Sequence, residues 1–140
     1  MISKTIEETH KLARDLGKEA EGGGVICLYG DLGSGKTEFT KGLAQYFGIN
    51  KFSIKSPTYT YVRKYETPKL HFYHIDLYRL EKIDDLMAME IEEIMCVEKN
   101  IIVIEWADKM SEILPKKRID IKFKYLNENE REIQIDKRAP

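Results

Sequence analysis

The sequence predicts a single α/β domain over residues 1–140, with a mostly parallel central sheet, antiparallel strands at its edges and helices on both faces. Two fully apolar runs of β-forming residues, 25–29 and 101–104, are typical of strands buried on both faces. Helical segments alternate with the strand candidates along the chain, as in sheets built from crossover connections. The last two strand candidates instead alternate apolar and polar residues, which is typical of an antiparallel hairpin.

Each element follows from its local pattern. An amphipathic helix occupies the first 20 residues, and the triple glycine at 22–24 ends it. A helix that starts near Lys36 has apolar residues four apart and stops at Gly48. A third helix has an acidic start, which suits the positive end of a helix dipole. In order, the expected elements are a helix to residue 20, a strand over 25–29, a helix over 36–47, strands within 53–65 and over 70–77, a helix over 84–95, a strand over 101–104, and a hairpin of 119–125 with 132–135.

Composition excludes several classes of protein. The chain has 23 Lys and Arg against 24 Asp and Glu, a net charge of -1, which argues against binding nucleic acid by charge alone. No apolar run approaches the roughly 20 residues of a membrane span, and no signal-peptide core opens the chain. Cys27 and Cys96 lack metal or redox spacing, so we expect both to be reduced and buried in a cytoplasmic protein.

One motif carries chemistry directly. Residues 30–37 read G-D-L-G-S-G-K-T and fit the phosphate-binding loop G-x-x-x-x-G-K-[ST], between a predicted strand and a predicted helix. Such a loop wraps its backbone N–H groups around a phosphate at a helix N-terminus. Its lysine reaches the β- and γ-phosphates, and its last hydroxyl binds Mg²⁺. The predicted nucleotide-binding residues are Asp31, Leu32, Gly33, Ser34, Gly35, Lys36 and Thr37, with Lys36 also acting in catalysis.

The nucleotide and the remaining site residues follow from other patterns. The guanine-reading motif of GTPases is missing, because Asn50-Lys51-Phe52-Ser53 has serine where aspartate belongs, so ATP is expected. Glu105 ends an apolar strand, as the acid that completes a Mg²⁺ shell does. Asp76 ends another strand candidate. Because α/β sheets place ligands at the carboxyl ends of their strands, both acids are candidates to face the loop.

Other features have structural interpretations. His71 and His74 lie three residues apart on a predicted strand and so point to opposite faces, which argues against a shared metal ion. Met87, Met89 and Met95 are expected to lie in the core or to contact a partner. The tyrosines between residues 59 and 78 could stack on RNA bases, but half-buried strand positions are the simpler interpretation.

Five segments follow one another along the chain: G-D-L-G-S-G-K-T at 30–37, S-P-T-Y-T at 56–60, H-I-D-L-Y-R-L at 74–80, I-E-W-A-D at 104–108 and I-L-P at 113–115. Together they resemble the TsaE (YjeE) family, the ATPases of bacterial tRNA threonylcarbamoyladenosine (t6A) synthesis. The resemblance runs over essentially the whole chain. Ser34 stands where alanine is common in that family, a small-for-small replacement.

The resemblance implies roles for matching residues. Thr37 and Glu105 would coordinate Mg²⁺, and Asp76 would be needed for ATP hydrolysis by positioning or activating water. Thr58, within Ser56-Pro57-Thr58, would belong to a switch segment that senses the γ-phosphate. Trp106 would lie beside the nucleotide, and so would Thr9. The implied partners are TsaD and TsaB, with tRNA acting at that complex.

The sequence thus predicts an ATP-binding, Mg²⁺-dependent ATPase subunit of t6A37 modification, slow alone and stimulated by TsaD and TsaB. Two alternatives stay open. A small-molecule P-loop kinase would transfer the γ-phosphate to a metabolite, although no arginine-rich lid is visible. A non-catalytic, nucleotide-gated assembly protein would need ATP binding only.

Overall fold

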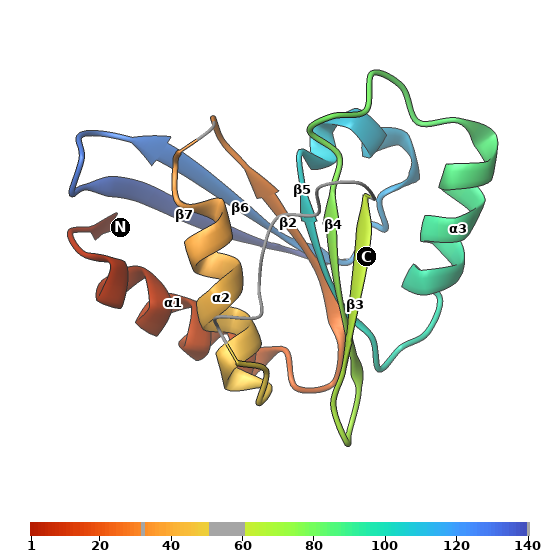
Figure 1. Cartoon of the computed structure of the whole chain (residues 1–140), viewed down its shortest axis with the longest axis horizontal. Coiled ribbons are helices and arrows are strands. Elements are labelled where there is room, and N and C mark those ends of the chain that lie inside the picture. Colours follow the sequence, from red (N-terminus) through yellow and green to blue (C-terminus); the bar gives the residue numbers. More distant parts are fainter. Residues whose placement is uncertain (32, 51–60, 140) are drawn as a thin grey trace.

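The computed structural model describes residues 1–31, 33–50 and 61–139. Their elements alternate between strands and helices as the sequence predicts (Figure 1). In chain order they are β1 (Ile2–Ser3), α1 (Ile6–Glu19), β2 (Gly24–Tyr29), α2 (Lys36–Tyr46), β3 (Val62–Glu66), β4 (His71–Asp76), α3 (Asp85–Met95), β5 (Ile101–Glu105), the 3₁₀ segment η2 (Ala107–Ile113), β6 (Arg118–Tyr125) and β7 (Arg131–Arg138).

The described strands form one mixed sheet in the order β1-β7-β6-β2-β5-β4-β3. Its centre is parallel, because β2 pairs in parallel with both β5 and β6, and β5 also pairs in parallel with β4. The edges are antiparallel, through β3 with β4, β6 with β7, and β1 with β7. This arrangement confirms the predicted fold class.

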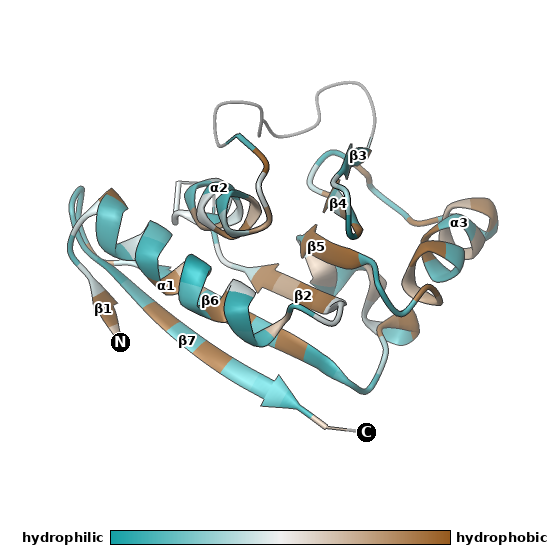
Figure 2. Ribbon diagram, turned by 90° about the horizontal axis from the view of Figure 1, so that it is seen from below, coloured by the Kyte–Doolittle hydropathy of each residue, from teal (hydrophilic) through white to brown (hydrophobic). Residues whose placement is uncertain are grey.

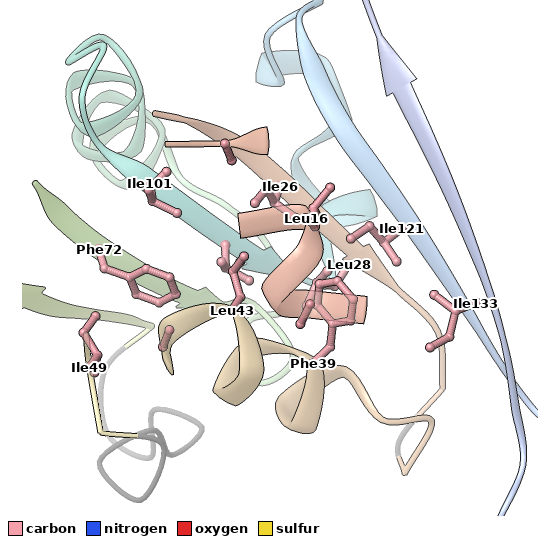
Figure 3. Packing of buried hydrophobic residues seen from close by; sticks show 14 of the residues in the cluster. Leu16, Ile26, Leu28, Phe39, Leu43, Ile49, Phe72, Ile101, Ile121 and Ile133 are labelled. Atoms are coloured by element: carbon pink, nitrogen blue, oxygen red, sulfur yellow. The ribbon is translucent and has the colours of Figure 1, made fainter. Parts of the chain in front are cut away.

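Helices cover both faces of the sheet, and each face has its own apolar core. On one face, α1 and α2 lie side by side and bury Leu16, Phe39 and Leu43 against residues of the central strands such as Leu28 (Figures 1 and 3). On the other face, α3 and η2 pack against the alternate residues of the same strands. Because β2 is buried on both faces, its residues 25–28 are all apolar, as the sequence indicated.

Helix ends follow ordinary capping chemistry. The Thr5 hydroxyl accepts a hydrogen bond from the Glu8 amide at 3.0 Å and starts α1. The Asp84 carboxylate accepts one from the Met87 amide at 2.8 Å and starts α3. Gly48 follows α2 with a φ of 86°, a left-handed value that glycine adopts without strain.

Three features depart from the sequence prediction. Strand β1 is only two residues long, too short for any periodicity. Segment η2 was not expected, and its backbone leaves helical geometry at Met110. Cys27 is buried as predicted, but Cys96 is exposed, so the expectation that both thiols are buried is wrong for Cys96. Cys96 caps the C-terminal end of α3, on the side that turns away from the core.

Among the described residues, none of the helices is long and apolar enough to cross a membrane.

Candidate functional site

The candidate site lies where three neighbouring parallel strands end. Strand β5 lies between β2 and β4, so its last residue, Glu105, pairs in register with Leu28 on one side and Asp76 on the other. The loop after β2 begins at Gly30, two residues beyond Leu28. The sheet therefore brings the glycine-rich loop, Glu105 and Asp76 to one edge, which is where open α/β sheets bind ligands.

The loop geometry depends on its glycines. Gly30, Gly33 and Gly35 all have positive φ values, of 148°, 77° and 104°. A side chain at Gly30 would also meet the carbonyl oxygen of Phe123 at 2.7 Å, so the loop lies tightly against β6. Gly35 stands at the capping position of α2, where no side chain bonds the first-turn amides. A bare helix N-terminus of this kind is suited to an anion.

Lys36 is the centre of charge in the site. Its side chain is largely buried and its ammonium donates a hydrogen bond to the Gly30 carbonyl, within its own loop. Burial lowers the pKa of Lys36, and the nearby carboxylates of Glu105 and Asp76, followed by those of Asp31 and Asp108, oppose that shift. The lysine thus lies among carboxylates from three segments of the chain. Asp108, in η2, is a member of this cluster that the sequence did not single out.

Trp106 covers the lysine. The Lys36 ammonium lies 3.8 Å from the centre of the indole ring, within the range of a cation–π interaction. Trp106 also packs against Tyr78 with ring centres 5.2 Å apart. Among the described residues it is the only non-glycine with a positive φ, 61°, a conformation that costs a bulky residue energy and is commonest at functional sites.

Glu105 is held by a histidine. The Nε2 atom of His74 lies 2.5 Å from Oε2 of Glu105, and the two residues are 0% and 3% exposed. Because a carboxylate can only accept, His74 donates this hydrogen bond and orients the acid. The sequence predicts only that His74 lies on a strand and shares no metal ion with His71. Its position directly before Ile75-Asp76 was the available signal, but the partner could be found only from the register of β4 with β5.

Asp76 is oriented by its own chain. Its Oδ1 atom accepts a hydrogen bond from the Tyr78 amide at 3.0 Å. Burial raises the pKa of Asp76, while the Tyr78 hydrogen bond lowers it and Glu105 raises it further. The Lys109 ammonium donates to the carbonyls of Tyr78 and Leu80, both at 2.7 Å, and so fixes the turn that follows Asp76.

Arg131 is a further residue that sequence reasoning missed. A side chain at Gly35 would meet Cδ and Nε of Arg131, both at 2.8 Å, so the arginine lies directly on the loop. Its Nε is buried without a hydrogen-bond partner among the described residues. Arg131 pairs in the sheet with Ser3, whose hydroxyl lies 2.7 Å from that of Thr9. Thr9 therefore lies beside β1, and its own hydrogen bonds go to Ser3 and Thr5.

The other predicted residues are placed as follows. Asp31 is exposed, and its carbonyl accepts from the Ser34 amide at 3.1 Å. The Ser34 hydroxyl is buried and has no partner within the described part of the chain. Thr37 lies in the first turn of α2 and is half-buried. Leu32 and Thr58 lie outside the described residues.

The predicted Mg²⁺ site can be compared with the side chains that are present. Within residues 1–31, 33–50 and 61–139, no group of three or more His, Cys, Asp or Glu side chains could hold a metal ion. Mg²⁺ in nucleotide sites uses one or two protein oxygens, with phosphate and water supplying the rest. A threonine hydroxyl and one oriented, buried carboxylate, Thr37 and Glu105, are donors of that kind. The residues present therefore fit Mg²⁺ bound together with a nucleotide, and do not form a separate protein-only site.

Fold and loop together define the class. A parallel sheet whose central strand leads through G-x-x-x-x-G-K-T into a helix is the architecture of the P-loop NTPases. Comparison with known proteins then narrows the class. The family model of "Threonylcarbamoyl adenosine biosynthesis protein TsaE" matches residues 3–133. The chain belongs to the TsaE family.

Curated relatives and a solved structure agree. The TsaE protein of Bacillus subtilis is 39% identical over 127 residues, which cover 91% of this chain and 78% of that protein. The TsaE protein of Aquifex aeolicus is 36% identical over 138 residues, covering 96% and 93%. The crystal structure of Bacillus subtilis YdiB superposes with a TM-score of 0.75 at 32% identity and covers 99% of this chain and 84% of that one.

Proposed function

We propose that this protein is a Mg²⁺-dependent ATPase subunit of tRNA t6A37 modification that acts in the cytoplasm with TsaD and TsaB. Family membership supports the pathway, since the matching curated relatives are named tRNA threonylcarbamoyladenosine biosynthesis proteins. The observation that carries the ATPase half is the meeting of Lys36 with Glu105, Asp76 and Trp106 at one sheet edge. A loop that only bound phosphate would not need a buried acid, Glu105, and a half-buried one, Asp76, beside its lysine.

In this proposal the loop, Lys36 and Arg131 bind the phosphates of ATP. The amides of residues 31–37 and the N-terminus of α2 bind the phosphates. Lys36 exchanges its contact with the Gly30 carbonyl for the β- and γ-phosphates. Arg131, which lies against Gly35 with an unpaired Nε, adds a second positive charge to the phosphates. Thr9, Thr58 and Trp106 complete the nucleotide contacts in this proposal.

Hydrolysis depends on the acids. Thr37 and Glu105 hold Mg²⁺, which when bound neutralises phosphate charge as it develops. His74 keeps Glu105 pointed in one direction. Asp76 receives a hydrogen bond from the attacking water at a carboxylate oxygen and accepts its proton, while the other carboxylate oxygen stays bonded to the Tyr78 amide. Burial raises the pKa of Asp76, which makes this carboxylate a stronger base than an exposed aspartate.

Phosphate release from ATP, measured with and without the TsaD–TsaB pair, tests this proposal. We expect slow release by the isolated protein and a rise of about tenfold or more with the pair, equivalent to roughly 1.4 kcal/mol in the barrier. Lys36→Ala should abolish ATP binding, whereas Lys41→Ala, on the same helix and paired with Glu38 at 3.0 Å, should leave it intact. Asp76→Asn should bind ATP normally and hydrolyse it about 10²–10⁴ times more slowly.

The alternatives predict different results. A small-molecule kinase would release little phosphate until a metabolite is added, and would be indifferent to TsaD and TsaB. A nucleotide-gated assembly protein would support t6A formation equally well as wild type and as Asp76→Asn. Asp15→Asn, an exposed aspartate of α1, is the matched control for the loss of one carboxylate.

A further inference from the structure

Helix α3 presents apolar side chains to solvent. Leu86 is 75% exposed and Met89, one turn further, is 58% exposed. Val97, just beyond the end of the helix, is 53% exposed. The opposite side of α3 is the one that packs on the sheet, through the fully buried Ile91. Figure 2 shows the contrast with α1, which is mostly hydrophilic, whereas hydrophobic residues colour much of α3.

The charge around these apolar residues is mostly negative, although the exposed Lys82 and Lys99 flank them in the sequence. Residues 83–98 include six acidic side chains and no lysine or arginine. Within the described residues, Glu90 accepts a hydrogen bond from the Tyr61 hydroxyl at 2.7 Å, and no ion pair neutralises the exposed Glu92, Glu93 or Glu98. We call Leu86, Met89 and Val97, with Glu92, Glu93 and Glu98, the α3 face. Glu93 lies seven and four residues from Leu86 and Met89, so it shares their side of the helix. We call the three carboxylates of this face its charged rim.

This combination selects one kind of occupant. A nucleic acid is disfavoured, because its phosphates would meet mainly carboxylates. A second copy of the chain is also disfavoured. A symmetric contact of two α3 faces would set carboxylates against carboxylates. A contact of α3 with the other exposed apolar residues of helices and strands, Ile2, Ile6 and Tyr125, would be head-to-tail. An apolar centre with a charged rim is the ordinary anatomy of a protein interface.

We propose that the α3 face docks a protein partner whose surface carries apolar side chains flanked by lysines and arginines. The inference rests on the proposed function, in which the partner is the TsaD–TsaB pair. It adds where that pair makes contact and which chemistry it must present.

Helix α3 is connected to the candidate site, so a partner bound to α3 can affect Asp76. Strand β4 ends at Asp76, and the chain enters α3 nine residues later, at Asp85. Lys109 fixes the intervening turn through two carbonyls. At its middle, α3 meets Tyr61, the first described residue after position 50, through Glu90. A partner on α3 would therefore contact a helix that is hydrogen-bonded to Tyr61, before Asp76 in the chain, and that directly follows the turn after Asp76.

Three double variants of the full chain test the proposal. Leu86→Gln with Met89→Gln removes the apolar centre and leaves the charge unchanged. Glu92→Gln with Glu93→Gln removes rim charge. Ile2→Gln with Ile6→Gln is the matched control, since these residues are about 50% exposed and belong to β1, at one edge of the sheet, and to α1, on the face opposite α3. Each protein is titrated onto the immobilised TsaD–TsaB pair at low and high salt, and its affinity and association rate are measured. ATP binding and oligomeric state are measured in parallel.

We expect the apolar variant to weaken binding by about tenfold or more, as loss of central interface contacts does. The charge variant should slow association and flatten its dependence on salt. The control should bind like wild type, and all proteins should bind ATP equally. If wild type does not bind the pair, the proposed partners and this inference fail together. Equal binding by wild type and the apolar variant overturns this inference alone, as does a finding that α3 variants change self-association while partner binding stays the same.

Discussion

Replacing His74 by leucine should destabilise the protein more than almost any other single change near the site. Leucine fills part of the same buried volume but removes the donor that lies 2.5 Å from the Glu105 carboxylate. Glu105 is 3% exposed, so water cannot replace the lost hydrogen bond. Leaving a buried acceptor without its donor costs about 1–3 kcal/mol, and more when the acceptor is charged. The nearby Lys36 ammonium compensates part of the charge, so we expect about 3 kcal/mol.

Three further variants isolate the interaction. Glu105→Gln in the His74→Leu background removes the uncompensated charge, so the double variant should be about 2 kcal/mol more stable than the sum of the single effects. His74→Gln keeps an N–H donor and should lose about 1 kcal/mol. His71→Leu, on the exposed side of the same strand, should change stability by less than about 0.5 kcal/mol.

Urea unfolding of these proteins at pH 7 without nucleotide gives the free energies directly, and a magnesium titration of ATP hydrolysis gives the functional effect. Because His74 orients a proposed Mg²⁺ ligand, its loss should raise the Mg²⁺ concentration for half-maximal activity by about 10–100-fold. Additive single effects, with a loss below about 1 kcal/mol for His74→Leu, would refute the reasoning. The contact would then be a packing contact without electrostatic weight.

Three other predictions follow from single contacts. Phosphate binding should draw the Lys36 ammonium from its position 3.8 Å above Trp106, so the fluorescence of this only tryptophan should change on adding ATP and Mg²⁺ and stay flat in Lys36→Ala. Gly42→Ala should destabilise by about 1–2 kcal/mol in urea unfolding despite its better helix propensity, because the new Cβ would lie 2.7 Å from the His10 Cα where α1 crosses α2. Arg131→Gln should weaken ATP binding by about tenfold or more in calorimetry, and an unchanged affinity would remove the arginine from the site.

The sequence predicted the elements well where a local pattern determines them. The strand, loop and helix around residues 24–46 follow from an apolar run, three glycines with positive φ and a regular helical period, all within 23 residues. The hairpin of β6 and β7 follows from alternation and a polar turn. Strand β1 was not predicted, because two residues are too few to show a periodic pattern. It forms by pairing with the edge of β7.

For the candidate site, the sequence predicts only those residues that belong to recognisable motifs. Lys36, Asp76 and Glu105 each end or follow a strand, so their meeting required no knowledge of strand order beyond a parallel centre. The pairing of His74 with Glu105 joins residues 31 positions apart and depends on the register of β4 with β5, which no local pattern records. Arg131 reaches the loop from the C-terminal hairpin, through the placement of β6 beside β2.

The groups proposed for phosphate binding and those proposed for hydrolysis are connected to different faces of the sheet. On one face, α2 packs closely on α1, and α2 follows the glycine-rich loop, so the groups proposed to bind phosphate belong to a close-packed layer. The chain segments that leave Asp76 and Glu105 enter the other layer, as the turn into α3 and as η2, and Lys109 joins them by two hydrogen bonds. A partner on α3 would therefore act on the segments that carry the acids and Trp106, and not on the layer that holds Lys36. ATP affinity should then change little when the partner binds, and the rate of hydrolysis should change most.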